Sequence, residues 1–87
     1  MDLRTTRSTV RFVHPFEIRG LDGPQQAGIY DVDTEEEVIE TLHRTVYVRV
    51  ATLLYIRSVG MTRTVTVDPG DLAVALERDR KADGQAP

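Results

Sequence analysis

The stretch TVYVRVATLLYIRS, residues 45–58, decides the fold of this chain. β-branched and aromatic residues dominate it, and these residue types favour strands. Both alternating sets of positions are largely apolar; one set is Val46, Val48, Val50, Leu54 and Ile56, and the other is Tyr47, Ala51, Leu53 and Tyr55. A strand that is apolar on both faces belongs in the middle of a sheet or under a helix. We therefore expect one long strand here. It should bend near Ala51, because strands usually span only about five or six residues.

The segment before this strand is strongly acidic. DVDTEEEVIE, residues 31–40, holds six acids and no base, whereas residues 41–67 hold four arginines and no acid. The spacing of Asp31, Asp33 and Glu35 imitates the opening of a calcium loop. Such a loop needs glycine at its sixth position and an acid at its twelfth, and Glu36 and Leu42 stand there instead. The sequence therefore argues against a metal site.

A short helix and a strand remain as alternatives for the acidic segment. A helix over 35–42 is supported by the capping box of Thr34 and Glu37. A strand would fold back through a turn onto the long strand and place Val38 opposite Val46. The ion pairs predicted by this register are Glu40 with Arg44 and Glu35 with Arg49. Opposite charges across a ladder contribute ~0.2–1 kcal/mol each, so the strand explains the segregation of charge and is favoured.

The N-terminal part of the chain predicts a flexible end and a kinked strand. Residues 1–8 are polar and charged, and we expect them to be frayed. Apolar and polar residues alternate over 9–19, which is typical of a strand. Pro15 interrupts this strand, because proline cannot donate to a ladder. Glycine and proline then mark residues 19–28 as a turn region.

The C-terminal part predicts a short strand and a helix. RTVTV at 63–67 alternates as a strand does. Asp68 is a favoured N-cap residue, and Pro69 suits the first helical position. Leu72, Ala75, Leu76 and Asp79 line one stripe of this helix, with Ala73 and Val74 beside it. A helix of about 11 residues is marginal alone, so it must dock on the sheet.

These elements predict an α+β fold in one domain. We expect a mostly antiparallel, curled sheet of about four strands, in the manner of a small SH3-like barrel, with one C-terminal helix. The expected division is a flexible N-terminus at 1–8, a single domain at 9–81 and a flexible tail at 82–87.

Composition narrows the functional classes. The chain has 87 residues, a net charge of -3 and no cysteine, so neither disulfides nor thiolate metal sites are available. The acidic balance argues against nucleic acid, which attracts basic surfaces. No run reaches the ~18 apolar residues of a membrane span, and the N-terminus lacks the apolar stretch of a signal peptide. A cytoplasmic location with no membrane partner is the expectation.

The sequence offers no convincing catalytic group or cofactor site. His14 lies at the proline kink and His43 in a turn, and a bond to a backbone carbonyl is the commoner fate of such histidines. No glycine-rich phosphate loop is present. An enzyme that combines His14 with Asp31 or Asp33 is a distant alternative. We therefore expect a non-enzymatic protein without metal or cofactor.

One set of side chains suggests a surface for interaction. Alternation along the long strand places Tyr47, Arg49, Tyr55 and Arg57 on one face. The expected function is a protein-interaction module, acting on an unknown protein partner or by self-association. The alternative is weak RNA or nucleotide binding by stacking on these tyrosines. Half-buried packing of the tyrosines is the simpler interpretation of the same pattern.

Several landmarks together resemble a known class of protein. They are VRFVHPFEIRG at 10–20, AGIYDV at 27–32, TEEE at 34–37, RVATLL at 49–54 and VDPGDLAVAL at 67–76. This order resembles small bacterial domains of unknown function that carry a His-Pro-Phe stretch, an Ala-Gly-x-Tyr and a Glu-Glu run. The resemblance covers about residues 10–79. It implies a compact bacterial domain and no activity, so it assigns no catalytic role to any residue.

Overall fold

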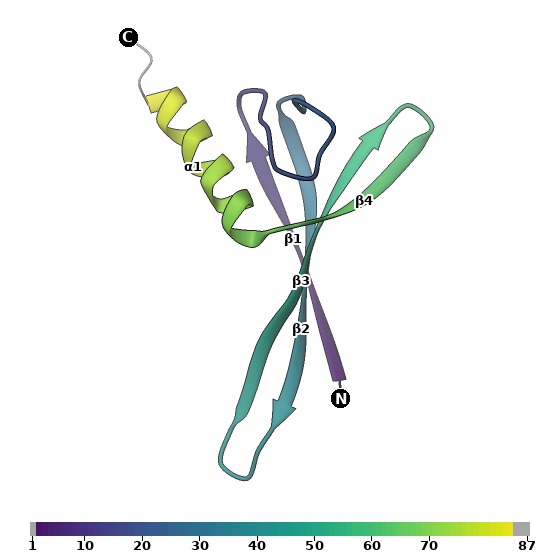
Figure 1. The fold of residues 1–87 in the computed structure, drawn as a ribbon, viewed down its shortest axis with the longest axis vertical. Coiled ribbons are helices and arrows are strands. Elements are labelled where there is room, and N and C mark those ends of the chain that lie inside the picture. The colour runs from purple at the N-terminus through teal and green to yellow at the C-terminus, as the bar shows by residue number, and fades with distance from the viewer. Residues whose placement is uncertain (1, 85–87) are drawn as a thin grey trace.

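The computed structural model describes residues 2–84, and side chains for residues 2–82. It consists of one antiparallel sheet and one helix (Figure 1). The sheet contains β1 (Asp2–Phe12), β2 (Gly28–Glu40), β3 (Thr45–Ser58) and β4 (Met61–Val67) in that spatial order, and α1 (Pro69–Gly84) follows. The predicted class, a four-stranded curled antiparallel sheet with a C-terminal helix, is confirmed. Within the described residues β1 and β4 do not pair, so the sheet is open and forms no closed barrel.

The acidic segment is a strand, as favoured from the sequence. β2 runs through it and pairs with β1 on one side and β3 on the other, and the alternative helix over 35–42 does not form. The predicted register was wrong by one residue, because Val38 lies opposite Tyr47. The turn explains the difference. Thr41 N–H donates to the Arg44 carbonyl at 2.9 Å and Arg44 N–H donates to Thr41 Oγ1 at 3.1 Å, so Arg44 belongs to the turn.

The predicted bend in the long strand is a β-bulge. Glu35 lies opposite Ala51, and the next residue of β2, Glu36, lies opposite Arg49. Val50 is therefore an extra residue in β3. A bulge of this kind breaks the alternation of the strand that contains it. Consequently, the alternation that assigns side chains to the two faces of the sheet before Val50 cannot be continued past it.

The first strand differs from its predicted bounds. It begins at Asp2, so residues 2–8, expected to be frayed, pair with β2. It ends at Phe12 rather than continuing to residue 19. The reason lies in the helix: the Asp79 carboxylate accepts the N–H groups of Val13 and His14, each at 2.8 Å. Pro15, which has no N–H, then completes the departure from the ladder.

Helix α1 begins as the sequence predicted and runs further than expected. The Asp68 carboxylate oxygen Oδ1 accepts the N–H groups of Gly70 at 2.7 Å and Asp71 at 3.2 Å, which is the geometry of an N-cap. The helix continues to Gly84, into the segment expected to be a tail. Residues 85–87 of that expected tail lie outside the described residues.

The hydrophobic core occupies one half of the sheet. Its buried members come from β1, β2, β3, β4, the β1–β2 connection and α1; they are Phe12, Phe16, Ile18, Val32, Leu54, Ile56, Val67, Leu72 and Ala75. The rings of Phe12 and Phe16 stack with centroids 3.6 Å apart, and Tyr30 packs edge-on against both. The β1–β2 connection and α1 both lie at this end of the sheet (Figure 1).

The other half of the sheet extends away from the core as an arm. We define the arm as residues 34–50, which form the hairpin between β2 and β3, with residues 2–6 of β1 alongside. No helix lies beside it in Figure 1, and the molecule measures 55 × 35 × 18 Å. Its exposed apolar side chains include Leu3, Ile39, Leu42, Tyr47, Val48 and Val50.

Candidate functional site

The acids of β2 pair mainly with arginines of β1, not with those predicted. Arg4 Nη2 donates to Glu36 Oε1 at 2.8 Å, and Arg57 Nη2 of β3 donates to Asp31 Oδ2 at 2.6 Å. Within the described residues, the predicted pairs of Glu40 with Arg44 and Glu35 with Arg49 are not formed. The turn separates these partners, because it includes Arg44 and sets Glu40 opposite Thr45 and Glu36 opposite Arg49. In addition β1, expected to begin at Thr9, supplies arginines from the other side of β2.

A three-residue polar cluster occupies the face of the sheet opposite the core. Arg7 binds Asp33 through two bonds, Nε to Oδ1 at 2.8 Å and Nη2 to Oδ2 at 3.1 Å, and its guanidinium lies 4.7 Å from the Tyr55 ring centroid. Tyr55 donates its hydroxyl to Asp33 Oδ2 at 2.6 Å. The bonds from Arg7 and Tyr55 lower the pKa of Asp33 to about 2. The bond to Asp33 raises the pKa of Tyr55. The hydrogen bonds of this cluster are therefore made within the chain, and Arg7 balances the negative charge of the Asp33 carboxylate.

The four predicted interaction residues do not share a face. Tyr47 and Arg49 lie opposite Val38 and Glu36, whereas Tyr55 and Arg57 contact Asp33 and Asp31. Successive residues of β2 point to opposite faces, so the two pairs lie on opposite sides of the sheet. The bulge is the cause. Tyr55 and Arg57 are also engaged by acids, which leaves no continuous tyrosine and arginine face of the kind on which the RNA hypothesis depended.

His14 is bound to an acid that the sequence analysis did not assign to it. Its ring Nδ1 lies 3.1 Å from Asp79 Oδ1, and Asp79 is buried, with 8% of its surface exposed. Hydrogen bonds from the backbone N–H groups of Val13 and His14, together with the bond to the His14 ring, hold the pKa of Asp79 below its ordinary value. The signal was present in the sequence, because Asp79 interrupts the apolar stripe of the helix. An acid on such a stripe requires a polar partner.

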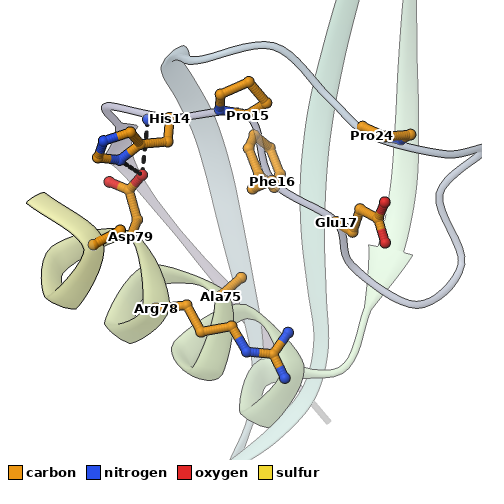
Figure 2. Close-up of a pocket in the computed structure, with 9 residues that line it drawn as sticks. His14, Pro15, Phe16, Glu17, Pro24, Ala75, Arg78 and Asp79 are labelled. Carbon is orange, nitrogen blue, oxygen red and sulfur yellow. Dashed lines mark hydrogen bonds and ion pairs between the residues drawn. The ribbon is translucent and has the colours of Figure 1, made fainter.

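A cavity of about 470 Å³ opens beside this pair (Figure 2). Its walls come from the β1–β2 connection and from α1; they are His14, Pro15, Phe16, Glu17, Pro24, Ala75, Arg78, Asp79 and Ala82. A histidine oriented by a carboxylate is a familiar general base. None of these lining residues is serine, threonine or cysteine, however, so the cavity contains no side chain for such a base to activate.

The other candidate groups lie elsewhere. Asp31 and Asp33 bind Arg57 and Arg7, so the structure does not bring them together with His14 as the enzyme alternative required. His43 lies in the turn between β2 and β3, where its backbone N–H donates to Thr41 Oγ1 at 3.4 Å. Among the side chains described, those of residues 2–82, no three from histidine, cysteine, aspartate or glutamate gather as a metal site would require.

The most distinctive exposed feature is an unpaired strand edge on the arm. β4 pairs with β3 only from Thr52 to Ser58, although β3 begins at Thr45. The outer edge of β3 over residues 45–51, which we call the arm edge, therefore has no neighbouring strand among the described residues. Its apolar side chains are exposed, by 48% at Tyr47, 42% at Val48 and 50% at Val50. The long strand predicted beside a short one implies such an uncovered edge, which invites strand addition by a partner.

No helix among the described residues is long and apolar enough to cross a membrane. Comparison of the chain with protein-family models, with curated proteins and with solved structures found no match.

Proposed function

We propose that this chain is a non-enzymatic interaction module that binds an extended polypeptide along its arm edge. An open strand edge presents a row of N–H and C=O groups that a further strand can satisfy. Added strands gain affinity from these main-chain bonds and specificity from alternate side chains. The observation that carries the proposal is the length difference between β3 and β4. It leaves the outer edge of β3 over residues 45–51 without a neighbouring strand in the part of the chain that the structure describes.

The composition of the arm edge supports this role. Proteins commonly protect free edges with lysine, with proline or with several charges. The arm edge, TVYVRVA, has no lysine and no proline, and Arg49 is its single charge. By contrast, the free edge of β1 carries Arg4, Arg7 and Arg11. The outer edge of β4 also has no neighbouring strand among the described residues, but Met61 is the one exposed large apolar side chain of that strand. Of these three edges, the arm edge is therefore the best template for a partner strand.

A pair of synthetic peptides tests the proposal. The first is a heptapeptide of alternating valine and threonine, and the second is identical except that every backbone nitrogen is methylated. We expect the first peptide to shift the amide resonances of Thr45–Ala51, and the methylated peptide to lose this effect because neither of its edges retains an N–H donor. Equal binding of both peptides, or shifts confined to other strands, would contradict strand addition.

A matched pair of variants locates the binding surface. Val48→Lys places a charge on the arm edge, whereas Val59→Lys makes the same change at the fully exposed turn between β3 and β4, where Val59 has a relative exposure of 104%. We expect Val48→Lys to weaken peptide binding about tenfold and Val59→Lys to leave it unchanged. Equal affinities for the two variants would place the site elsewhere.

A further inference from the structure

We infer that the occupant of the arm edge is a second copy of this chain, whose own arm edge runs antiparallel to the first. This inference rests on the proposed function, which leaves the partner open. Antiparallel pairing of two identical edges is symmetric, so that one residue faces its own copy across a two-fold axis. The bulge at Val50 limits regular pairing to residues 45–49. The centre of that segment is Tyr47, which we place on the axis.

This register gives compatible neighbours on both faces of the joined sheet. Tyr47 faces Tyr47 of the second copy, Val46 faces its Val48, and Thr45 faces its Arg49. Aromatic and β-branched pairs of this kind are the favourable cross-strand pairs, whereas like charges directly opposite are unfavourable. Here the single charge of each edge meets a threonine. Full-length self-pairing of β1 would instead place Arg7, the central residue of that strand, directly against its own copy.

The same register brings a second pair of complementary features together. The partner's arm would continue the line of β4, because both run antiparallel to β3 along the same edge. Its hairpin tip, residues 41–44, would then arrive where β4 leaves the sheet. A groove of about 420 Å³ lies at this point. It is lined by residues 49–52 and 66–69, among them Val50, Ala51, Val67 and Pro69.

The hairpin tip carries side chains that suit this groove. Leu42 is 98% exposed, and the apolar part of the groove offers a site where it would be shielded from water. Arg44 of the same tip would approach Asp68, which also lines the groove, with opposite charge. These matches favour a second copy over a partner of another sequence, because each copy supplies both the tip and the groove.

Cysteine cross-linking tests the axis. The chain has no natural cysteine, so Tyr47→Cys introduces a single thiol that would face its own copy within disulfide reach. We expect mild oxidation to convert this variant to a covalent dimer at least about tenfold faster than Val48→Cys or Val59→Cys. Equal rates for the three variants, or fastest coupling through Val48→Cys, would overturn the Tyr47 register.

Sedimentation of the full chain tests self-association itself. Between about 10 µM and 1 mM we expect a reversible monomer–dimer equilibrium, as befits a short strand contact. Leu42→Asp should weaken it about tenfold, although Leu42 has almost no contacts to lose within one copy. The control Val59→Asp changes an equally exposed tip and should leave it unaltered.

The outcomes separate this inference from the proposed function. A chain that stays monomeric yet binds the valine–threonine peptide at the arm edge would refute the second copy and keep strand addition. A chain that stays monomeric and does not bind the valine–threonine peptide at the arm edge would refute both the second copy and strand addition. Growth into polymers beyond the dimer would indicate pairing of the arm edge with β1 of the next copy, and would overturn the two-fold arrangement.

Discussion

At the scale of the residue, one buried side-chain oxygen on the core side of the described sheet has no hydrogen-bond partner. Thr52 is 4% exposed, and within the described residues its Oγ1 has no hydrogen-bond partner. It lies in β3 two residues before Leu54, which is fully buried with 0% exposure. A buried hydroxyl that has lost its water without gaining a partner lowers the stability of the folded state.

Replacing this hydroxyl should therefore stabilise the protein. Thr52→Val keeps the β-branched shape and removes the desolvated group, so we expect the free energy of unfolding to rise by about 1 kcal/mol. Urea unfolding measures the change. Thr66→Val makes the same substitution at an exposed position of β4 and should change stability by less than about 0.5 kcal/mol. A loss of stability in Thr52→Val would mean that the hydroxyl has a partner.

The charge of Asp33 should make stability depend on pH. Its pKa is lowered from 3.8 to about 2 by Arg7 and Tyr55, so the unfolded chain binds a proton in this range that the folded chain does not. Stability should therefore fall as the pH falls from about 4 to 2. In Asp33→Asn this part of the pH dependence should be absent, and urea unfolding at a series of pH values measures it. Asp22→Asn, at a side chain that is 93% exposed, is the control whose profile should match the wild type.

At the scale of the element, one carboxylate joins the helix to the end of the first strand. Asp79 of α1 accepts the N–H groups of Val13 and His14 and lies against the His14 ring. These are the donors that would otherwise continue the ladder of β1. The contact thus ends the strand, orients the connection that carries Phe16 into the core, and fixes where the helix lies.

Loss of this contact should weaken the docking of the helix. Asp79→Asn replaces one acceptor oxygen by an amide donor, which would face backbone N–H groups, and we expect the melting temperature to fall by roughly 5–10 °C. Thermal unfolding followed by circular dichroism measures it. Glu77→Gln alters a partly exposed residue of the same helix in the same way. An equal fall in both variants would show that helix charge, rather than the Asp79 contact, is responsible.

At the scale of the whole molecule, stability is divided unequally along the sheet. The half near α1 contains the core, whereas the arm has strand pairing and exposed apolar side chains but no second layer of secondary structure from residues 2–84 (Figure 1). Regions with few buried contacts open locally at lower free energy than the core. The arm is therefore the part of the fold with most to gain from a partner.

Amide hydrogen exchange should reveal this division. In dilute protein we expect the amides of 34–39 and 45–49 to exchange through local opening, well before those of 52–56. Raising the protein concentration should slow exchange at 45–49 if the arms pair. Uniform protection along β3 at every concentration would contradict both the division and the pairing.

The sequence by itself determined the element types and their order. Its β-branched run predicted β3, its alternation with opposite charge predicted that the acidic segment is a strand, and Asp68 with Pro69 predicted where the helix begins. These features are local, because propensity, alternation and capping act over a few residues. They were sufficient for the α+β class and for a turn after the acidic strand.

Only the tertiary structure decided the register, the faces and the partners of individual side chains. A single extra residue, Val50, moves Tyr47 and Arg49 to the face opposite Tyr55 and Arg57, and periodicity alone cannot locate such a bulge. The pairing of Asp79 with His14 joins residues 65 positions apart. The arm edge exists because two neighbouring strands differ in length. Each of these depends on contacts between distant segments, which local sequence patterns do not specify.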